Sequence, residues 1–352
     1  MRINKLSVID GKCYLFKDRL NRRYLSGTDI AEGFLLIAEK PVYFTDLRYY
    51  SAAKDKISKS GITPCVYKSI DDLAAEIKAQ NVKTVYIDYI RTTLSECEEY
   101  RKSFGNVKFA DCSEELTALR RVKDESEAES IKNACAIAER AVNDAFSRLY
   151  EGMTEKELKK FVEDRMSALG GEGAAFDTIV AFGKNAAVPH HETGNTKLVK
   201  NRAVLIDTGC KVNGYCSDIT RTAFFGEPDA EFLKAYDAVY SANLKAEEEI
   251  YAGMSGKAAD KIARDLLKAR GYGEYFTHSL GHGVGLEIHE SPFLSPKSCD
   301  ILDNGMVFTV EPGVYMEGRF GIRVEDTCIM ENGKAKRLFK DDKKPRIISA
   351  EK

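Results

Sequence analysis

The stretch VLIDTGCKVNGYCSD at residues 204–218 decides the fold of the C-terminal part of the chain. Its dipeptide Asn213-Gly214 is the strongest short sequence signal for a two-residue β-hairpin turn. A turn there pairs Val212 with Tyr215, and the pairing continues outward along both strands. The sequence therefore predicts an antiparallel hairpin around this turn.

Two aspartates lie on one face of this hairpin. Its register places Gly209 opposite Asp218, and Asp207, two residues before Gly209, emerges on the same face as Asp218. We expect no basic residue to face the two aspartates between them and the turn. The two charges would therefore repel each other unless a cation lies between them.

A second stretch, FTVEPGVYMEGRFGIRVED at residues 308–326, repeats this arrangement. Glu311 and Glu325 occupy the points that correspond to the two aspartates, and both face one side if the turn is centred on Gly318. A single acid in a hairpin is usually a surface charge. Four acids at equivalent points of two apolar hairpins instead predict a shared site.

An internal repeat supports this correspondence. LYEGMT at residues 149–154 recurs as IYAGMS at residues 250–255, and each copy opens an amphipathic helical segment that ends at a glycine, Gly170 or Gly271. We interpret the repeat as a duplication of two α-β halves within one α+β domain.

The N-terminal third of the chain has a different pattern. Short β-like runs such as residues 34–37 alternate with helical segments such as residues 71–78, which is typical of a small α/β domain. Asp124, followed by a glutamate three residues later, forms a capping box that opens a new helix. We expect one domain at residues 1–120 and a second at residues 121–352.

Composition excludes several classes of function. The 352 residues include 53 Lys and Arg against 55 Asp and Glu, so there is no bulk positive field to hold nucleic acid. No apolar run has signal-peptide length or the ~18 residues that span a membrane. The nine cysteines are spread out without a Cys-x-x-Cys pair, which is typical of reduced thiols. We expect a soluble, cytoplasmic protein without nucleic-acid or membrane partners.

The histidines gather in the C-terminal half, at residues 190, 191, 278, 282 and 289. His282 lies in a glycine-rich segment, where the backbone can approach a ligand closely. Four carboxylates and this imidazole would balance the charge of two divalent cations; the five residues are Asp207, Asp218, His282, Glu311 and Glu325. Such oxygen-rich ligation favours Mn²⁺ or a similar ion over a structural zinc.

Further motifs resemble those of a known family. They are Pro189-His190, Gly281-His282-Gly, Ile288-His289-Glu, EPGVY at 311–315 and GIRVED at 321–326. With the spacing of the five acid and histidine positions, they make the chain similar to the pita-bread dinuclear metallopeptidases, specifically the Xaa-Pro peptidases (aminopeptidase P and prolidase). NRRYLSG at 21–27 and TDLRY at 45–49 resemble the creatinase-type N-terminal domain of these enzymes. The expected fold is a pita-bread catalytic domain preceded by a smaller creatinase-type α/β domain.

The resemblance implies a hydrolytic site. Two divalent ions, Mn²⁺ first and Co²⁺ or Zn²⁺ as alternatives, would activate water for attack on the peptide bond. Glu311 would be a ligand and the general base, while His190 and His289 would hydrogen-bond the substrate carbonyl and the developing oxyanion. Tyr315 and Arg323 would hold the ligand side chains in place without binding the ions themselves.

The resemblance also leaves some points open. His278 would lie either behind the ligands or in the substrate pocket, and His191 receives no role. The implied substrates are proline-containing peptides, and the implied assembly is a homodimer.

Two activities compete within the family. Some prolidases carry an arginine shortly after the His-Glu motif, where SPFLS at residues 291–295 has none. The main expectation is therefore an Xaa-Pro aminopeptidase, and the alternative is an Xaa-Pro dipeptidase (prolidase). A non-catalytic binding protein on the same fold is a remoter alternative, because such relatives generally lose the acids. A dinuclear phosphoesterase would need more His and Asn ligands and basic residues that bind phosphate. The sequence near the acids does not show them.

Overall fold

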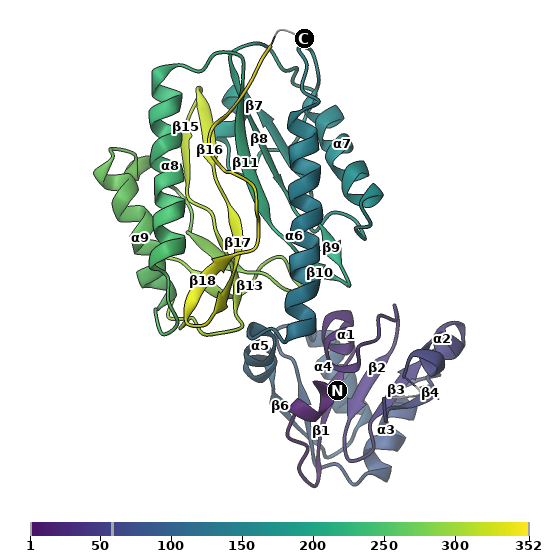
Figure 1. Cartoon of the computed structure of the whole chain (residues 1–352). Helices are drawn as coiled ribbons and strands as arrows, with labels where there is room; N and C mark the ends of the chain where they lie inside the picture. The colour runs from purple at the N-terminus through teal and green to yellow at the C-terminus, as the bar shows by residue number, and fades with distance from the viewer. Residues whose placement is uncertain (1, 58–59, 351–352) are drawn as a thin grey trace. The chain divides into compact units, whose positions relative to one another are not determined.

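The computed structural model describes residues 2–57 and 60–350 (Figure 1). The chain divides into two compact units, Met1–Arg120 and Arg121–Lys352. Within the described ranges, no helix combines the length and the apolar character that a membrane span needs.

The N-terminal unit contains one six-stranded sheet in the order β4-β3-β2-β1-β5-β6. Its strands are β1 (Lys12–Phe16), β2 (Phe34–Ile37), β3 (Val42–Thr45), β4 (Thr63–Val66), β5 (Thr84–Ile87) and β6 (Lys108–Asp111). Its helices are α1 (Arg19–Ser26), α2 (Leu47–Ile57), α3 (Ile70–Ala79), α4 (Leu94–Ser103) and α5 (Ser113–Arg121). The neighbouring strands β1, β5 and β6 are parallel, as expected for strands joined through helices. The predicted α/β character is confirmed.

Two pairs of helices frame the C-terminal unit. Figure 1 shows α6 (Glu125–Phe146) with α7 (Glu155–Ala168) on one side of the strands, and α8 (Ala230–Glu249) with α9 (Gly256–Ala269) on the other. Each pair buries its apolar face against its own cluster of core residues. This architecture is the predicted duplication of α-β halves, so the α+β interpretation is confirmed.

The predicted helix signals are found at the ends of these helices. Asp124 caps α6 with the predicted capping box. Thr154 and Ser255 are the N-caps of α7 and α9 and accept hydrogen bonds from the first turn. Gly170 and Gly271 follow the last turns with φ of 96° and 86°, a left-handed conformation that glycine adopts without strain.

The strands of this unit form two main sheets and two small hairpins. One sheet contains β7 (Ile179–Phe182), β8 (Arg202–Thr208), β11 (Ile219–Phe225) and β19 (Arg346–Ile348). The other contains β12 (Gly281–Gly283), β13 (Glu290–Leu294), β14 (Val307–Val310), β17 (Asp326–Glu331) and β18 (Lys334–Arg337). The hairpins are β9 (Lys211–Val212) with β10 (Tyr215–Cys216), and β15 (Gly313–Met316) with β16 (Phe320–Arg323). A bridge between Thr220 and Glu325 links the two halves.

The first hairpin has the predicted register. Val212 pairs with Tyr215 next to the turn, and Thr208 pairs with Ile219 farther along the two strands. Gly209 therefore lies opposite Asp218. A side chain at residue 209 could not be accommodated, because its Cβ would lie 1.9 Å from the carbonyl oxygen of Ser217.

The second hairpin is centred on Gly318, as predicted. Gly313 pairs with Arg323, and Val310 pairs with Asp326, so Glu311 and Glu325 lie opposite each other. Both glutamates fall in breaks between strands. Pro312 lacks the N–H that a continuous ladder would need at this point.

Candidate active site

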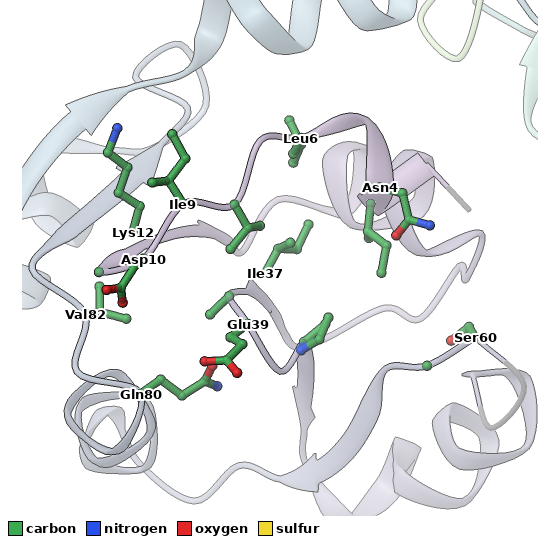
Figure 2. Close-up of a pocket in the computed structure, with 16 residues that line it drawn as sticks. Asn4, Leu6, Ile9, Asp10, Lys12, Ile37, Glu39, Ser60, Gln80 and Val82 are labelled. Atoms are coloured by element: carbon green, nitrogen blue, oxygen red, sulfur yellow. The ribbon is translucent and has the colours of Figure 1, made fainter.

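A cavity of about 320 Å³ in the C-terminal unit collects the predicted site residues. All five predicted metal positions line it: Asp207, Asp218, His282, Glu311 and Glu325. His190, His278, His289 and Arg323 also line it, whereas Tyr315 lies behind its wall and reaches it through Arg323. A larger hollow of about 840 Å³ in the N-terminal unit contains none of these residues (Figure 2). We therefore assign the site by the residues that line the smaller cavity and not by cavity volume.

Ligand atoms converge at the centre of this cavity. Asp218, His282 and Glu325 each offer an atom within 4.8 Å of the other two. His282 Nε2 lies 3.6 Å from Asp218 Oδ2 and 3.3 Å from Glu311 Oε1. These contacts unite residues from β12 and from both hairpins, so the site exists only where the two halves meet.

The acids are too close and too buried to carry their charges without a cation. Burial, and then the neighbouring carboxylates, raise the pKa values of Asp218 and Glu325 well above their ordinary range. Burial raises the pKa of Glu311 to about 8. Asp207 Oδ1 is buried and has no hydrogen-bond partner among the described residues. A set of carboxylates with an orphaned oxygen fits divalent cations.

Arg323 supplies a positive charge that the hairpin argument missed. Its guanidinium pairs with Asp207, donates from Nη1 to Tyr315 Oη at 2.7 Å and from Nε to Thr220 Oγ1 at 2.9 Å. The hairpin argument considered only the span between the aspartates and their own turn, and Arg323 lies outside that span. Arg323 comes from the second hairpin, which tertiary structure brings alongside.

Burial favours the neutral form of the histidines at the centre. Burial lowers the pKa of His282 to about 4 and that of His278 to about 3, with the Arg323 charge contributing to the latter. A neutral imidazole has a free lone pair for a metal ion. His278 Nε2 lies 2.8 Å from Tyr315 Oη, so His278, which lines the cavity, supports Arg323 through Tyr315.

His190 and His289 lie at the mouth of the site. The ring centroids of His289 and His282 are 4.3 Å apart, and burial lowers the pKa of His289. His190 follows the short helix η2 (Gly183–Ala187) on an irregular loop and is exposed. Both rings can therefore meet a bound ligand.

Two threonines were missed by the sequence argument. Thr309 Oγ1 donates to Glu311 Oε1 at 3.0 Å and accepts from the His282 backbone N–H at 3.1 Å. Thr220 donates its hydroxyl hydrogen bond to Glu325 Oε2. Thr309 lies two residues before Glu311, on the same face of the chain, and this alternation is the signal that could have found it.

Comparisons with known proteins cover most of the chain. Residues 129–332 match the metallopeptidase family M24 model, and residues 5–122 match the creatinase/prolidase N-terminal domain model. An Xaa-Pro dipeptidase of Pyrococcus furiosus is 36% identical over 327 residues, which is 92% of each chain.

Solved structures agree with this assignment. An X-Pro aminopeptidase of Thermotoga maritima has a TM-score of 0.93 at 35% identity and covers 99% of this chain and 100% of its own. An Xaa-Pro dipeptidase of Bacillus anthracis has a TM-score of 0.92 at 33% identity and covers 96% of this chain and 95% of its own. The expected creatinase-type domain followed by a pita-bread domain is thereby confirmed.

Proposed function

The chain belongs to metallopeptidase family M24, and from that premise we propose that it hydrolyses the bond between an amino-terminal residue and proline, preferring Xaa-Pro dipeptides. The observation that carries the proposal is the convergence of four carboxylates and one neutral imidazole in a single cavity. A binding protein would have no need to bury more carboxylates than the Arg323 charge can balance.

Asp207, Asp218, His282, Glu311 and Glu325 would hold two divalent ions, with Mn²⁺ the first candidate. Such ions supply a water of lowered pKa and polarise the substrate carbonyl. Glu311 can take up the proton released in the attack and deliver it from its carboxylate to the leaving proline nitrogen. His190 and His289 can donate hydrogen bonds to the carbonyl oxygen as negative charge develops on it.

Selectivity for proline follows from the wall of the cavity. Phe176, Ile179, Ile288 and Phe293 line it with apolar surface. An Xaa-Pro bond has no N–H and fixes the proline φ, so a pocket that packs the ring needs no hydrogen-bond acceptor for that nitrogen. Peptides with another residue at this position would leave their N–H without a partner.

The dipeptidase activity is preferred over the aminopeptidase activity for two reasons. A relative named Xaa-Pro dipeptidase matches over 92% of the chain, whereas the aminopeptidase expectation depended on one missing arginine near residues 291–295. A cavity of about 320 Å³ is also at the small end for ligand pockets, which suits a short substrate. A Thermotoga maritima protein named X-Pro aminopeptidase is also similar to this chain. The test of function therefore includes a tripeptide beside the dipeptide.

The test compares kcat/KM for Ala-Pro, Ala-Pro-Ala and Ala-Ala on the Mn²⁺-loaded protein. We expect Ala-Pro to exceed each of the others by at least about tenfold. Faster hydrolysis of Ala-Pro-Ala would favour the aminopeptidase, and equal hydrolysis of Ala-Ala would exclude proline selectivity. Metal analysis of the same sample checks for two ions per chain.

A further inference from the structure

We propose that Glu155 is a positioning residue for His190, and that His191 belongs to the same clamp. The inference rests on the proposed function, because His190 matters only if it meets substrate. Glu155 is the first residue of α7 and its side chain is fully buried.

The carboxylate of Glu155 ties both ends of the segment that carries His190. Its Oε1 accepts from the Phe182 backbone N–H at 2.9 Å and from Asn185 Nδ2 at 2.8 Å, before His190. Its Oε2 accepts from the Gly194 backbone N–H at 3.0 Å and lies 3.0 Å from His191 Nε2, after His190. One buried side chain therefore spans the loop at residues 182–194.

His190 depends on this support. Its ring makes no hydrogen bond with any residue in the ranges 2–57 and 60–350, and it is exposed at the cavity. Its position is consequently set by the backbone on either side. Displacement of a catalytic group by about 1 Å can lower the rate as much as 10²-fold. A less firmly held loop should therefore lower kcat.

The internal duplication argues that the fold itself does not need this carboxylate. The residue after N-cap Thr154 is Glu155, whereas the corresponding residue after N-cap Ser255 is Gly256. A Cβ at Gly256 would lie 2.0 Å from the carbonyl oxygen of Phe293, so backbone packs directly on the start of α9. The carboxylate is thus present only in the half whose adjoining loop carries His190.

Loss of the clamp should leave the loop attached. Thr193 Oγ1 accepts from the Val180 backbone N–H at 2.9 Å and donates to the Thr178 carbonyl at 3.2 Å. These bonds hold the loop to β7 without Glu155. A Glu155→Gln variant should therefore fold. Its amide NH₂ cannot accept a hydrogen bond, so at least one donor that the carboxylate satisfied loses its partner.

The experiment is a double-mutant cycle on the Mn²⁺-loaded full chain with Ala-Pro as substrate. We expect His190→Ala to lower kcat about 10²-fold and Glu155→Gln to lower it about tenfold, with KM and metal content nearly unchanged. In the His190→Ala background, Glu155→Gln should change kcat less than about twofold. Independent, multiplying effects would overturn the proposal.

Two further comparisons separate positioning from general damage. His191→Gln keeps a donor where Nε2 lies and should retain wild-type kcat, whereas His191→Leu should resemble Glu155→Gln. Glu157→Gln is the matched control, because Glu157 caps the same helix turn through Thr154 without touching the loop. It should leave kcat unchanged.

Amide hydrogen exchange gives a readout that does not depend on activity. Glu155→Gln should speed exchange of Phe182 and Gly194, while β8 and β11 stay protected. Unchanged exchange at these two amides would overturn the proposal. If the wild-type protein cleaves no Xaa-Pro dipeptide, the proposed function fails, and the exchange result still decides whether Glu155 holds the loop.

Discussion

Asp218 is one of the carboxylates whose charge is costly for the fold when no cation is bound. It is buried among Glu325, Asp207 and Glu311, and burial followed by these neighbours raises its pKa well above the ordinary range. An ionised Asp218 therefore destabilises the ion-free protein at neutral pH, while a bound cation would remove that penalty.

Asp218→Asn should abolish metal loading and peptide hydrolysis with the fold intact. In the ion-free state at pH 7, the neutral amide should raise the Tm relative to wild type, because it removes a buried like charge. Added Mn²⁺ should raise the Tm of wild type by mass action but not that of the variant. Asp164→Asn, at an exposed acid paired with Lys160 at 2.9 Å, is the control and should change neither result. A fully active Asp218→Asn protein would contradict the site assignment.

The contribution of Asp341 to folding stability has the opposite dependence on pH. Burial alone would raise its pKa, but hydrogen bonds and charge from Arg221 outweigh burial and lower it. A carboxylate with a lowered pKa stabilises the fold above its unfolded pKa, about 3.9, and that contribution is lost as pH falls through the lower folded pKa. Arg221 is itself fully buried and also bonds Asp326 at 2.8 Å.

We therefore expect Asp341→Asn to cost about 3 kcal/mol in the free energy of unfolding at pH 7. The difference from wild type should shrink as the pH is lowered below about 4. Urea titrations between pH 7 and pH 3 measure it, with Asp342→Asn, at an exposed neighbouring acid, as the control. A difference that stays constant over this range would show that the charge of Asp341 is not its source.

At the scale of elements, close backbone contact sets the position of η2, from which the His190 loop continues. Gly321 in β16 packs against Ala186 in η2, and a Cβ on Gly321 would lie 1.8 Å from the Ala186 carbonyl oxygen. A contact this short involves backbone on both sides, so rotation of a side chain cannot relieve it.

Gly321→Ala should consequently push η2 away from β16, with a loss of about 1–3 kcal/mol in stability and a lower kcat on Ala-Pro. Gly333→Ala is the control for the change of residue, because its Cβ would meet open space. The strain of its φ of 79° should cost about 1–2 kcal/mol in the same measurement without lowering kcat. Equal kcat values for the two variants would contradict the role given to this contact.

At the scale of the whole molecule, every residue of the candidate site belongs to the unit at 121–352, which also contains its own large core clusters. A unit with its own core can fold by itself. We expect a fragment of residues 121–352 to give a cooperative thermal transition and to bind two Mn²⁺ ions per chain, as measured by circular dichroism and metal analysis. An unfolded fragment, or a folded one without metal, would show that the N-terminal unit is needed to form the site.

Local sequence signals determined much of this protein. Asn213-Gly214 and Gly318 fixed the two hairpin registers, and the repeated segments at 149–154 and 250–255 indicated the duplicated halves. They succeeded because turn chemistry and strand alternation act over a few residues. The four acid positions could be chosen for the same reason, since each pair of acids belongs to one hairpin, whereas His282 was chosen from its glycine-rich segment.

Only the tertiary structure decided which groups far apart in the sequence meet. Arg323 pairs with Asp207 from 116 residues away, and His278 meets Tyr315 from 37 residues away. Glu155 reaches His191 over 36 residues. No periodicity or turn signal encodes such contacts, because the first results from the packing of the two halves against each other and the other two from the folding of a single half. The sequence thus determined the hairpins and their acids, while the fold decided which cation and which buried carboxylate support them.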